Sequence, residues 1–218
     1  ITSKDGEENY PGKLNLKVTY ELKKNSLSIS YRATTNKDTL CNLTNHAYFN
    51  LDGKGTILNH TLKMNADYYL PVDNSLIPLG NIESVENTPF DFRKAKKIKK
   101  ALDFKNTQIQ YGNGVDHNFC LNEEGRIKAT LESKESKIKM LVYTDKPGIQ
   151  IYTGNYISIE KGKQSLPYTR NSCIAIETQG YPDAINHKNF PSVILHSNEI
   201  YKSKTVYKFV SKWFVNSI

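Results

Sequence analysis

The most unusual stretch of the sequence is residues 44–51, TNHAYFNL, which carries an imidazole and two amides among apolar side chains. Strand alternation divides these side chains between two faces, with Asn45, Ala47 and Phe49 on one and Thr44, His46, Tyr48 and Asn50 on the other. Each buried polar group needs a hydrogen-bond partner, so a strand that only filled a core would not carry this many. The stretch predicts the floor of a cleft for a polyhydroxylated ligand. The alternative is a core strand with one satisfied histidine.

Two further stretches add polar side chains to expected strands. Residues 112–119, GNGVDHNF, follow a glycine-rich turn with the carboxylate of Asp116, an imidazole and an amide. Residues 147–155, PGIQIYTGN, open with a turn and then place Gln150 and Tyr152 on the same strand face. Taken singly, each is also explained as a turn aspartate or an exposed glutamine.

Glu177 stands at the end of the apolar run IAIETQ, residues 174–179. A carboxyl group at the end of a buried strand loses solvation, which raises its pKa toward the range useful for a general base. The alternative is an ordinary strand-end glutamate. Together the three later stretches supply one imidazole, two carboxylates and one amide, which form a general acid/base set with hydroxyl-binding partners. The sequence contains no phosphate-binding glycine loop, metal-ligand cluster or activated serine that competes with this interpretation.

The elements that must position these groups are predicted to be strands. Residues 14–22 alternate apolar and polar side chains as in a half-buried strand, and with residues 27–31 they form a hairpin. Further strands are expected at 58–64, with His60 structural, and at 127–131, 138–143, 149–157, 173–177, 193–195 and 205–209. Residues 68–92 are expected to form a long ordered loop, and residues 93–104 the one short helix. Many short strands with glycine, proline and asparagine turns indicate an all-β fold.

The composition is that of a single globular domain covering residues 1–218, with 38% hydrophobic and 24% charged residues. No run approaches the ~18 apolar residues of a membrane helix, so no membrane partner is expected. The net charge of +8 is spread along the chain. Its one dense run, residues 93–100, lacks interleaved aromatic residues and is interpreted as a solvated basic face, so no nucleic-acid partner is expected.

The cysteines indicate a reducing compartment. Cys41, Cys120 and Cys173 are odd in number and widely spaced, which fits neither a zinc site nor a disulfide framework. Residues 1–12 are polar and acidic, unlike a secretory signal. The sequence therefore predicts a cytoplasmic protein.

The polar stretches resemble the signature blocks of the galactose mutarotases, the aldose 1-epimerases. The matching blocks are TNHAYFNL, YLPVDNSLIP, TPFDFR, DHNF, PGIQIYTGN, IETQGYPDAINHKNFPS and TVYKF, in the family's order. This resemblance extends over essentially the whole chain. It implies a large antiparallel β-sandwich with an open sugar cleft, which interconverts the α and β anomers of free aldohexoses such as glucose and galactose without a metal or cofactor.

The resemblance also implies roles for four residues. Glu177 is similar to the family's general base, which takes the proton of the anomeric hydroxyl, and His46 to the general acid at the ring oxygen. Asp116 and Gln150 match positions that hydrogen-bond sugar hydroxyls. Two rival functions remain: a non-catalytic sugar-binding module, and a hexose-6-phosphate 1-epimerase. The second would need clustered arginines, and those of this sequence are scattered.

The sequence departs from the family pattern at its front. The family carries an Asn-Arg pair and a second histidine well before the segment resembling residues 6–12, whereas here no histidine or arginine precedes Arg32. The chain is thus expected to correspond to the later two-thirds of a mutarotase, with the N-terminal segment as a further partner. Alone, it is expected to associate through uncovered strand edges and to be nearly inactive.

Overall fold

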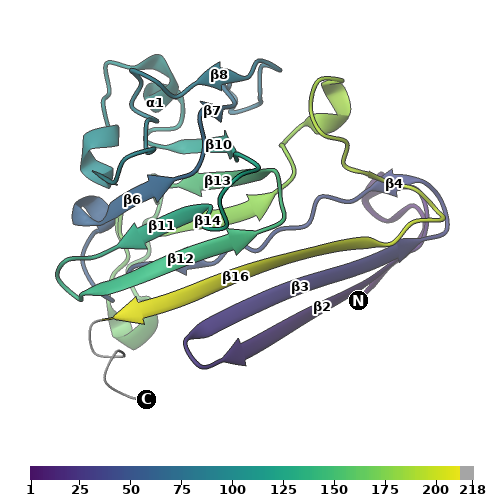
Figure 1. Cartoon of the computed structure of the whole chain (residues 1–218), viewed down its shortest axis with the longest axis horizontal. Coiled ribbons are helices and arrows are strands. Elements are labelled where there is room, and N and C mark those ends of the chain that lie inside the picture. The colour runs from purple at the N-terminus through teal and green to yellow at the C-terminus, as the bar shows by residue number, and fades with distance from the viewer. Residues whose placement is uncertain (212–218) are drawn as a thin grey trace.

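A computed structural model of the chain, which describes residues 1–211, consists mainly of two antiparallel sheets (Figure 1). In spatial order, the larger sheet contains β1 (Thr2–Ser3), β2 (Leu14–Lys23), β3 (Ser26–Thr35), β16 (Tyr201–Ser211), β12 (Ile138–Thr144), β11 (Ala129–Glu132), β6 (Thr61–Met64) and β9 (Lys96–Lys97). The smaller contains β5 (Tyr48–Phe49), β14 (Ile174–Gln179), β13 (Gly148–Tyr152), β10 (Asp116–Cys120), β7 (Tyr68–Tyr69) and β8 (Glu83–Ser84). A short pair joins β15 (Ile194–Leu195) to β4 (Thr39–Leu40).

Helical structure is sparse in the described part of the chain. The one α-helix, α1 (Thr107–Tyr111), begins at Asn106, whose side chain accepts hydrogen bonds from the Gln108 and Ile109 amides. The 3₁₀ turns are η1 (Glu7–Asn9), η2 (Ile57–Asn59), η3 (Ile98–Ala101), η4 (Lys163–Ser165) and η5 (Ala184–Asn186). Among the described residues, no helix has the length and apolar character needed to cross a membrane.

The larger sheet is built around β16. This strand follows the other strands along the chain, yet it lies between β3 and β12 and pairs with both (Figure 1). The β2–β3 hairpin flanks it on one side, as the alternation of residues 14–22 and 27–31 predicted. A strand from the far end of the described chain is therefore a central strand of this sheet.

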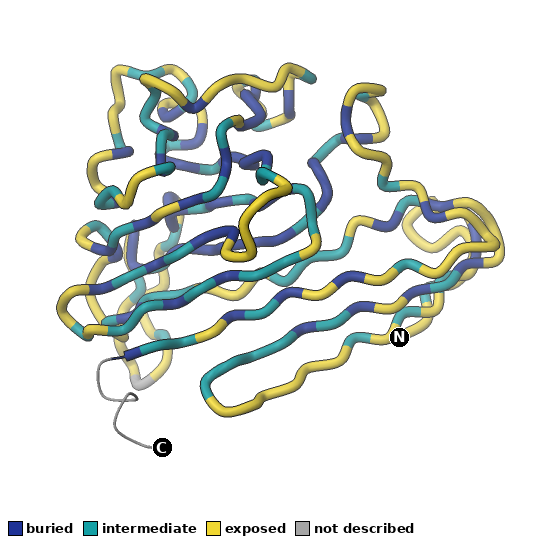
Figure 2. Tube along the Cα trace, viewed as in Figure 1, coloured by how far each residue is buried: buried dark blue, intermediate teal, exposed yellow. Residues whose placement is uncertain are grey.

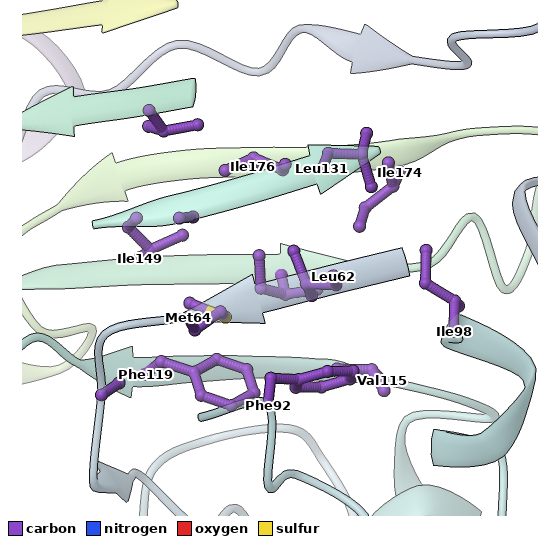
Figure 3. Packing of buried hydrophobic residues seen from close by; sticks show 14 of the residues in the cluster. Leu62, Met64, Phe92, Ile98, Val115, Phe119, Leu131, Ile149, Ile174 and Ile176 are labelled. Carbon is purple, nitrogen blue, oxygen red and sulfur yellow. The ribbon is translucent and has the colours of Figure 1, made fainter. Parts of the chain in front are cut away.

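The main hydrophobic core fills the space between the two sheets. Side chains on alternate positions of β6, β11 and β12 meet those of β10, β13 and β14 (Figure 3). Fully buried examples from the larger sheet are Leu62, Leu131 and Met140, and those from the smaller sheet include Phe119, Ile149 and Ile176. This layering is the antiparallel β-sandwich that the family resemblance implied, and it agrees with the all-β fold that the strand pattern indicated.

The outer end of β2 differs from the expected half-buried strand. Leu16 and Val18 pack against the core, but Tyr20 and Leu22 are 66% and 79% exposed. The end of the β2–β3 hairpin is correspondingly exposed (Figure 2). Alternation predicted the strand correctly and its burial wrongly, because a regular pattern does not say whether a second layer covers the apolar face.

Two other local predictions were wrong. Residues 44–51 contain only the two-residue strand β5, and residues 41–47 form no regular strand. The basic run at residues 93–100 forms β9 and the start of η3 in place of an α-helix. Lys96 in that run is drawn toward the core, where its Nζ donates to the Pro89 carbonyl and lies over the Phe92 ring. Tertiary contacts override the weak helical preference of so short a segment.

His60 anchors the end of the segment that contains β5. Its side chain is fully buried, and its Nε2 accepts a hydrogen bond of 3.0 Å from the Leu51 amide. Burial lowers the pKa of His60, so the ring is neutral and can accept this bond. The result agrees with the structural role expected for this histidine.

Candidate active site

Three adjacent strands of the smaller sheet hold most of the polar groups of the site. Across β10, β13 and β14, Asn118 pairs with Gln150, and Gln150 pairs with Glu177. Strand alternation places these three side chains on the outer face of the sheet, with Asp116 two residues before Asn118 on the same face. The intervening residues, such as Ile149, Ile151 and Ile176, fill the core. One face of the sheet is thus apolar and packs into the core, and the opposite face carries the polar side chains.

His46 reaches this face from the chain just before β5. Tyr48 and Phe49 pair with Ala175 and Ile174 of β14. When this antiparallel register is continued by two residues, His46 comes to lie opposite Glu177. The imidazole Nε2 is 3.3 Å from the Glu177 Oε1, and the His46 side chain is half exposed while that of Glu177 is 9% exposed. A short strand pair therefore joins a histidine and a carboxylate that are far apart in the sequence.

Asp116 and Gln150 form a second pair beside the first. The Gln150 Nε2 donates a hydrogen bond of 2.7 Å to the Asp116 Oδ1, across the ladder between β10 and β13. The structure therefore brings together all four side chains singled out from the sequence. They line one cavity of about 310 Å³.

The walls of this cavity combine polar and apolar groups. Its polar lining is His46, Asp116, Asn118, Gln150, Glu177 and Gln179, and its apolar lining is Leu70, Val72, Leu76, Pro78 and Pro182. The apolar wall comes largely from residues 68–92, the segment expected to be an ordered loop. Two larger hollows of about 700 and 820 Å³ lie around residues 121–130, but neither is lined by a histidine. The smaller cavity is therefore the candidate site.

Burial controls the electrostatics of the two carboxyl groups. Burial raises the pKa of Glu177, and the nearby Asp116 raises it further, while the positive charge of a protonated His46 opposes both effects. Burial likewise raises the pKa of Asp116, against the lowering effects of the Gln150 hydrogen bond and of His46. Such a carboxyl group binds a proton more readily than one in water and is suited to general acid/base chemistry.

The residues that precede the two members of the histidine–carboxylate pair both contact one tyrosine. The hydroxyl of Tyr207, on β16, lies 2.8 Å from the Ile176 carbonyl oxygen and 3.1 Å from the Asn45 Oδ1. These two residues immediately precede Glu177 and His46. The Tyr207 side chain is fully buried between the sheets. Its hydroxyl therefore fixes the position of the pair from the core side.

His117 does not belong to this site, although the sequence suggested its imidazole as part of the acid/base set. It alternates with Asp116 and points into the core, where it is fully buried against Phe90. Burial lowers its pKa to about 3. The neutral ring accepts from the Asp116 amide at Nδ1 and lies 3.1 Å from the Gln108 Oε1 at Nε2.

Three residues at the site were given no role there from the sequence. Asn118 and Gln179 line the cavity, and the Tyr207 hydroxyl contacts the Ile176 carbonyl on the core side of the sheet. Asn118 was recognisable, since it stands two residues after Asp116 and so shares its strand face. Nothing local marks Tyr207, because its role depends on the pairing of β16 with distant strands. The described residues contain no group of three or more histidine, cysteine, aspartate or glutamate side chains placed to hold a metal ion.

Comparison with known proteins gives consistent matches along the chain. A sequence model of the aldose 1-epimerase family matches residues 1–208. Galactose mutarotase from Rattus norvegicus is 44% identical over 212 residues, which cover 95% of this chain and 60% of that protein. Aldose 1-epimerase from Escherichia coli K12 is 38% identical over 219 residues, covering 97% of this chain and 63% of that protein. The chain therefore spans a little over half the length of these relatives.

A solved structure extends the similarity to the fold. The GalM/aldose epimerase homologue from C. elegans superposes with a TM-score of 0.88 at 32% identity, covering 97% of this chain and 64% of that one. The described sheets and the connections between them are thus similar to those of that protein.

Proposed function

The chain belongs to the aldose 1-epimerase family, and on this premise we propose that it interconverts the α and β anomers of free aldohexoses such as glucose and galactose. The observation that carries the proposal is the contact of 3.3 Å between the His46 imidazole and the buried Glu177 carboxylate, on the floor of a polar cavity. Anomer exchange needs a base at the C1 hydroxyl and an acid at the ring oxygen O5, and both of these oxygens are bonded to C1. Two groups in contact suit this requirement.

In the proposed reaction, Glu177 removes the proton of the C1 hydroxyl. The C1–O5 bond then breaks, and His46 gives a proton to O5, which leaves an open-chain aldehyde. Rotation about the C1–C2 bond exposes the other face of the aldehyde. O5 attacks that face and returns its proton to His46, while Glu177 returns its proton to the new C1 oxygen. Both groups regain their starting states, and the reaction consumes nothing but the original anomer.

Asp116 and Gln150 are proposed to bind sugar hydroxyls. Their mutual hydrogen bond of 2.7 Å holds the carboxylate and the amide in a fixed relative orientation. A carboxylate accepts from a hydroxyl, and the Gln150 Oε1, which has no protein partner among the described residues, accepts another. The pair would therefore orient the ring relative to His46 and Glu177.

Polarimetry on freshly dissolved α-D-glucose tests the proposal directly. The full-length protein is expected to speed the approach to the equilibrium rotation well above the spontaneous rate. Tight binding of glucose without this acceleration would favour a sugar-binding module. Acceleration only with hexose 6-phosphates would favour the phosphate-specific alternative, although the lining of the cavity includes no arginine or lysine.

Tyr207→Phe is expected to lower kcat about 3- to 10-fold with little change in KM. The substitution removes only the hydroxyl that contacts the Asn45 side chain and the Ile176 carbonyl, next to His46 and Glu177. A hydrogen bond of this kind is worth ~1 kcal/mol. Steady-state polarimetry separates the two kinetic constants. Tyr181→Phe is the matched control, because that buried hydroxyl contacts Cys120 and Tyr181 is not among the residues that line the cavity. If both variants lose stability alike but keep kcat, Tyr207 does not position the pair.

A further inference from the structure

Asn118 carries a buried amide that has no hydrogen-bond partner among the described residues. Its side chain lies on β10 and is 2% exposed, yet neither its Oδ1 nor its Nδ2 has a hydrogen-bond partner among the described residues. Buried amides are normally bonded, because an unpaired one loses its hydration without compensation. Asn155, which is equally buried, shows the usual case: its Nδ2 donates to the Gly112 and Val115 carbonyls, and its Oδ1 accepts from Thr153.

The Asn118 side chain belongs to the candidate site. It lines the same cavity as His46 and Glu177 and stands directly opposite Gln150 in the ladder between β10 and β13. The Gln150 Oε1 is also buried without a partner among the described residues. Neighbouring strands in the cavity lining thus hold one donor and two acceptors that have no partner among the described residues.

The neighbouring strand makes room for this amide at Gly148. A β-carbon at that position would lie 2.7 Å from the Asn118 Oδ1 and 3.0 Å from its Nδ2. These distances are too short for ordinary contact, so a larger residue would displace the amide. The glycine therefore allows the Asn118 amide to lie over β13 within the lining of the cavity.

We propose that Asn118 binds a hydroxyl of the sugar on the side of the ring remote from C1, at C3 or C4. The inference rests on the proposed function, which places C1 at His46 and Glu177. Glu177, Gln150 and Asn118 are opposite one another on three adjacent strands, which puts the backbones of the first and third about 10 Å apart. A hydroxyl both donates and accepts, so it matches the paired Oδ1 and Nδ2 of an amide.

This assignment makes Asn118 a determinant of substrate specificity. A buried site built to hydrogen-bond a hydroxyl discriminates strongly against an analogue that lacks it, because its own polar atoms are then left unpaired. The substrate class is therefore an aldose with a hydroxyl at the recognised position, and a deoxy sugar lacking it is a poor substrate.

The first test is Asn118→Leu, which keeps the branched shape of the side chain and removes both polar atoms. The expected result is a 10- to 100-fold loss in kcat/KM for α-D-glucose, carried mainly by KM, since the contact is made before the chemical step. The thermal midpoint is expected to stay the same or rise, because no protein hydrogen bond is lost. Asn155→Leu, the matched control for a buried asparagine, is expected to lower the midpoint.

The decisive test combines the variant with 2-, 3- and 4-deoxyglucose. The unmodified protein is expected to lose 10- to 100-fold in kcat/KM on the 3- or the 4-deoxy sugar, and Asn118→Leu is expected to lose almost nothing further on that sugar. Independent, additive losses would overturn the assignment, as would coupling at C2. If Asn118→Leu fails to fold, Asn118→Ala is used in the same comparison.

The two levels of proposal fail in different ways. If the unmodified protein does not accelerate the mutarotation of any of these sugars, the proposed function is wrong. If it does, and the Asn118 variants keep its kcat/KM on every sugar, only the role of Asn118 is wrong and its amide is a structural feature of the cavity floor.

Discussion

Glu177→Gln is expected to lower mutarotation at least ~10²-fold, the usual scale for loss of a general base. The amide keeps the shape of the side chain but cannot accept the proton of the C1 hydroxyl. Polarimetry on fresh α-D-glucose measures the loss. Glu132→Gln is the control, because that glutamate pairs with Lys139 in the larger sheet, away from the cavity, and its replacement should leave turnover unchanged. Near-normal turnover by the Glu177 variant would remove this residue from the mechanism.

The pH dependence gives a second signature of the same carboxyl group. The base must be ionised, so kcat/KM should fall as the pH decreases through the pKa of Glu177. Because that pKa is raised, the midpoint of the fall should lie above ~4.3, the ordinary pKa of glutamate. The residual rate of Glu177→Gln should lack this acid limb.

The same pKa shift makes a prediction about the stability of Glu177→Gln. Between the unfolded and the raised folded pKa, the folded protein holds the proton that the unfolded chain releases, so the free energy of unfolding falls as the pH rises through that window. Glutamine does not titrate, so the free energy of unfolding of the variant does not fall in this way as the pH rises. The inactive variant should therefore be at least as stable at neutral pH, which thermal denaturation can measure.

His46→Asn is expected to reduce kcat by ~10²-fold as well, since O5 would lose its proton donor as the C1–O5 bond breaks. His196→Asn is a close control. That imidazole is 52% exposed and 2.7 Å from the Asp38 carboxylate, against 51% and 3.3 Å for His46 and Glu177, but it lies outside the cavity. Equal turnover losses in the two variants would mean that an exposed histidine–carboxylate pair matters only for the fold.

The histidine variant should also move the acid limb. A protonated His46 lowers the pKa of Glu177, so its removal raises that pKa and shifts the limb to higher pH. Asp116 has the opposite effect, so Asp116→Asn should shift the limb to lower pH and also weaken sugar binding. Shifts of the same sign in the two variants would contradict the electrostatic description of the site.

The sequence predicted the strands better than their surroundings. Alternation located β2 and β3 because period-two burial is a local property that each strand carries in full. It could not show that the end of β2 is exposed, since that depends on which layer lies above it. It also extended β5 over residues 44–51, because polar and aromatic residues that line a cleft follow the same period as a strand.

Local sequence patterns and the family resemblance identified part of the site. His46, Asp116, Gln150 and Glu177 all line one cavity, although their functional roles stay predictions. His117 was counted with them because it is next to Asp116 in the sequence motif. In a strand, however, consecutive side chains point to opposite faces of the sheet, so His117 points into the core. Tyr207 was out of reach, since its contact with the Ile176 carbonyl exists only after β16 has entered the larger sheet.

The position of β16 between β3 and β12 has a consequence for the order in which the chain is synthesised. The ribosome makes β3 early and β12 much later, and neither can gain its shared neighbour until residues 201–211 have emerged. Until then both strands present open edges, and the Tyr207 hydroxyl that contacts the Asn45 side chain and the Ile176 carbonyl, next to His46 and Glu177, is absent. A nascent chain can therefore form the β2–β3 hairpin early, but the sandwich and the cavity geometry wait for β16. Edge protection by chaperones would matter most during that interval.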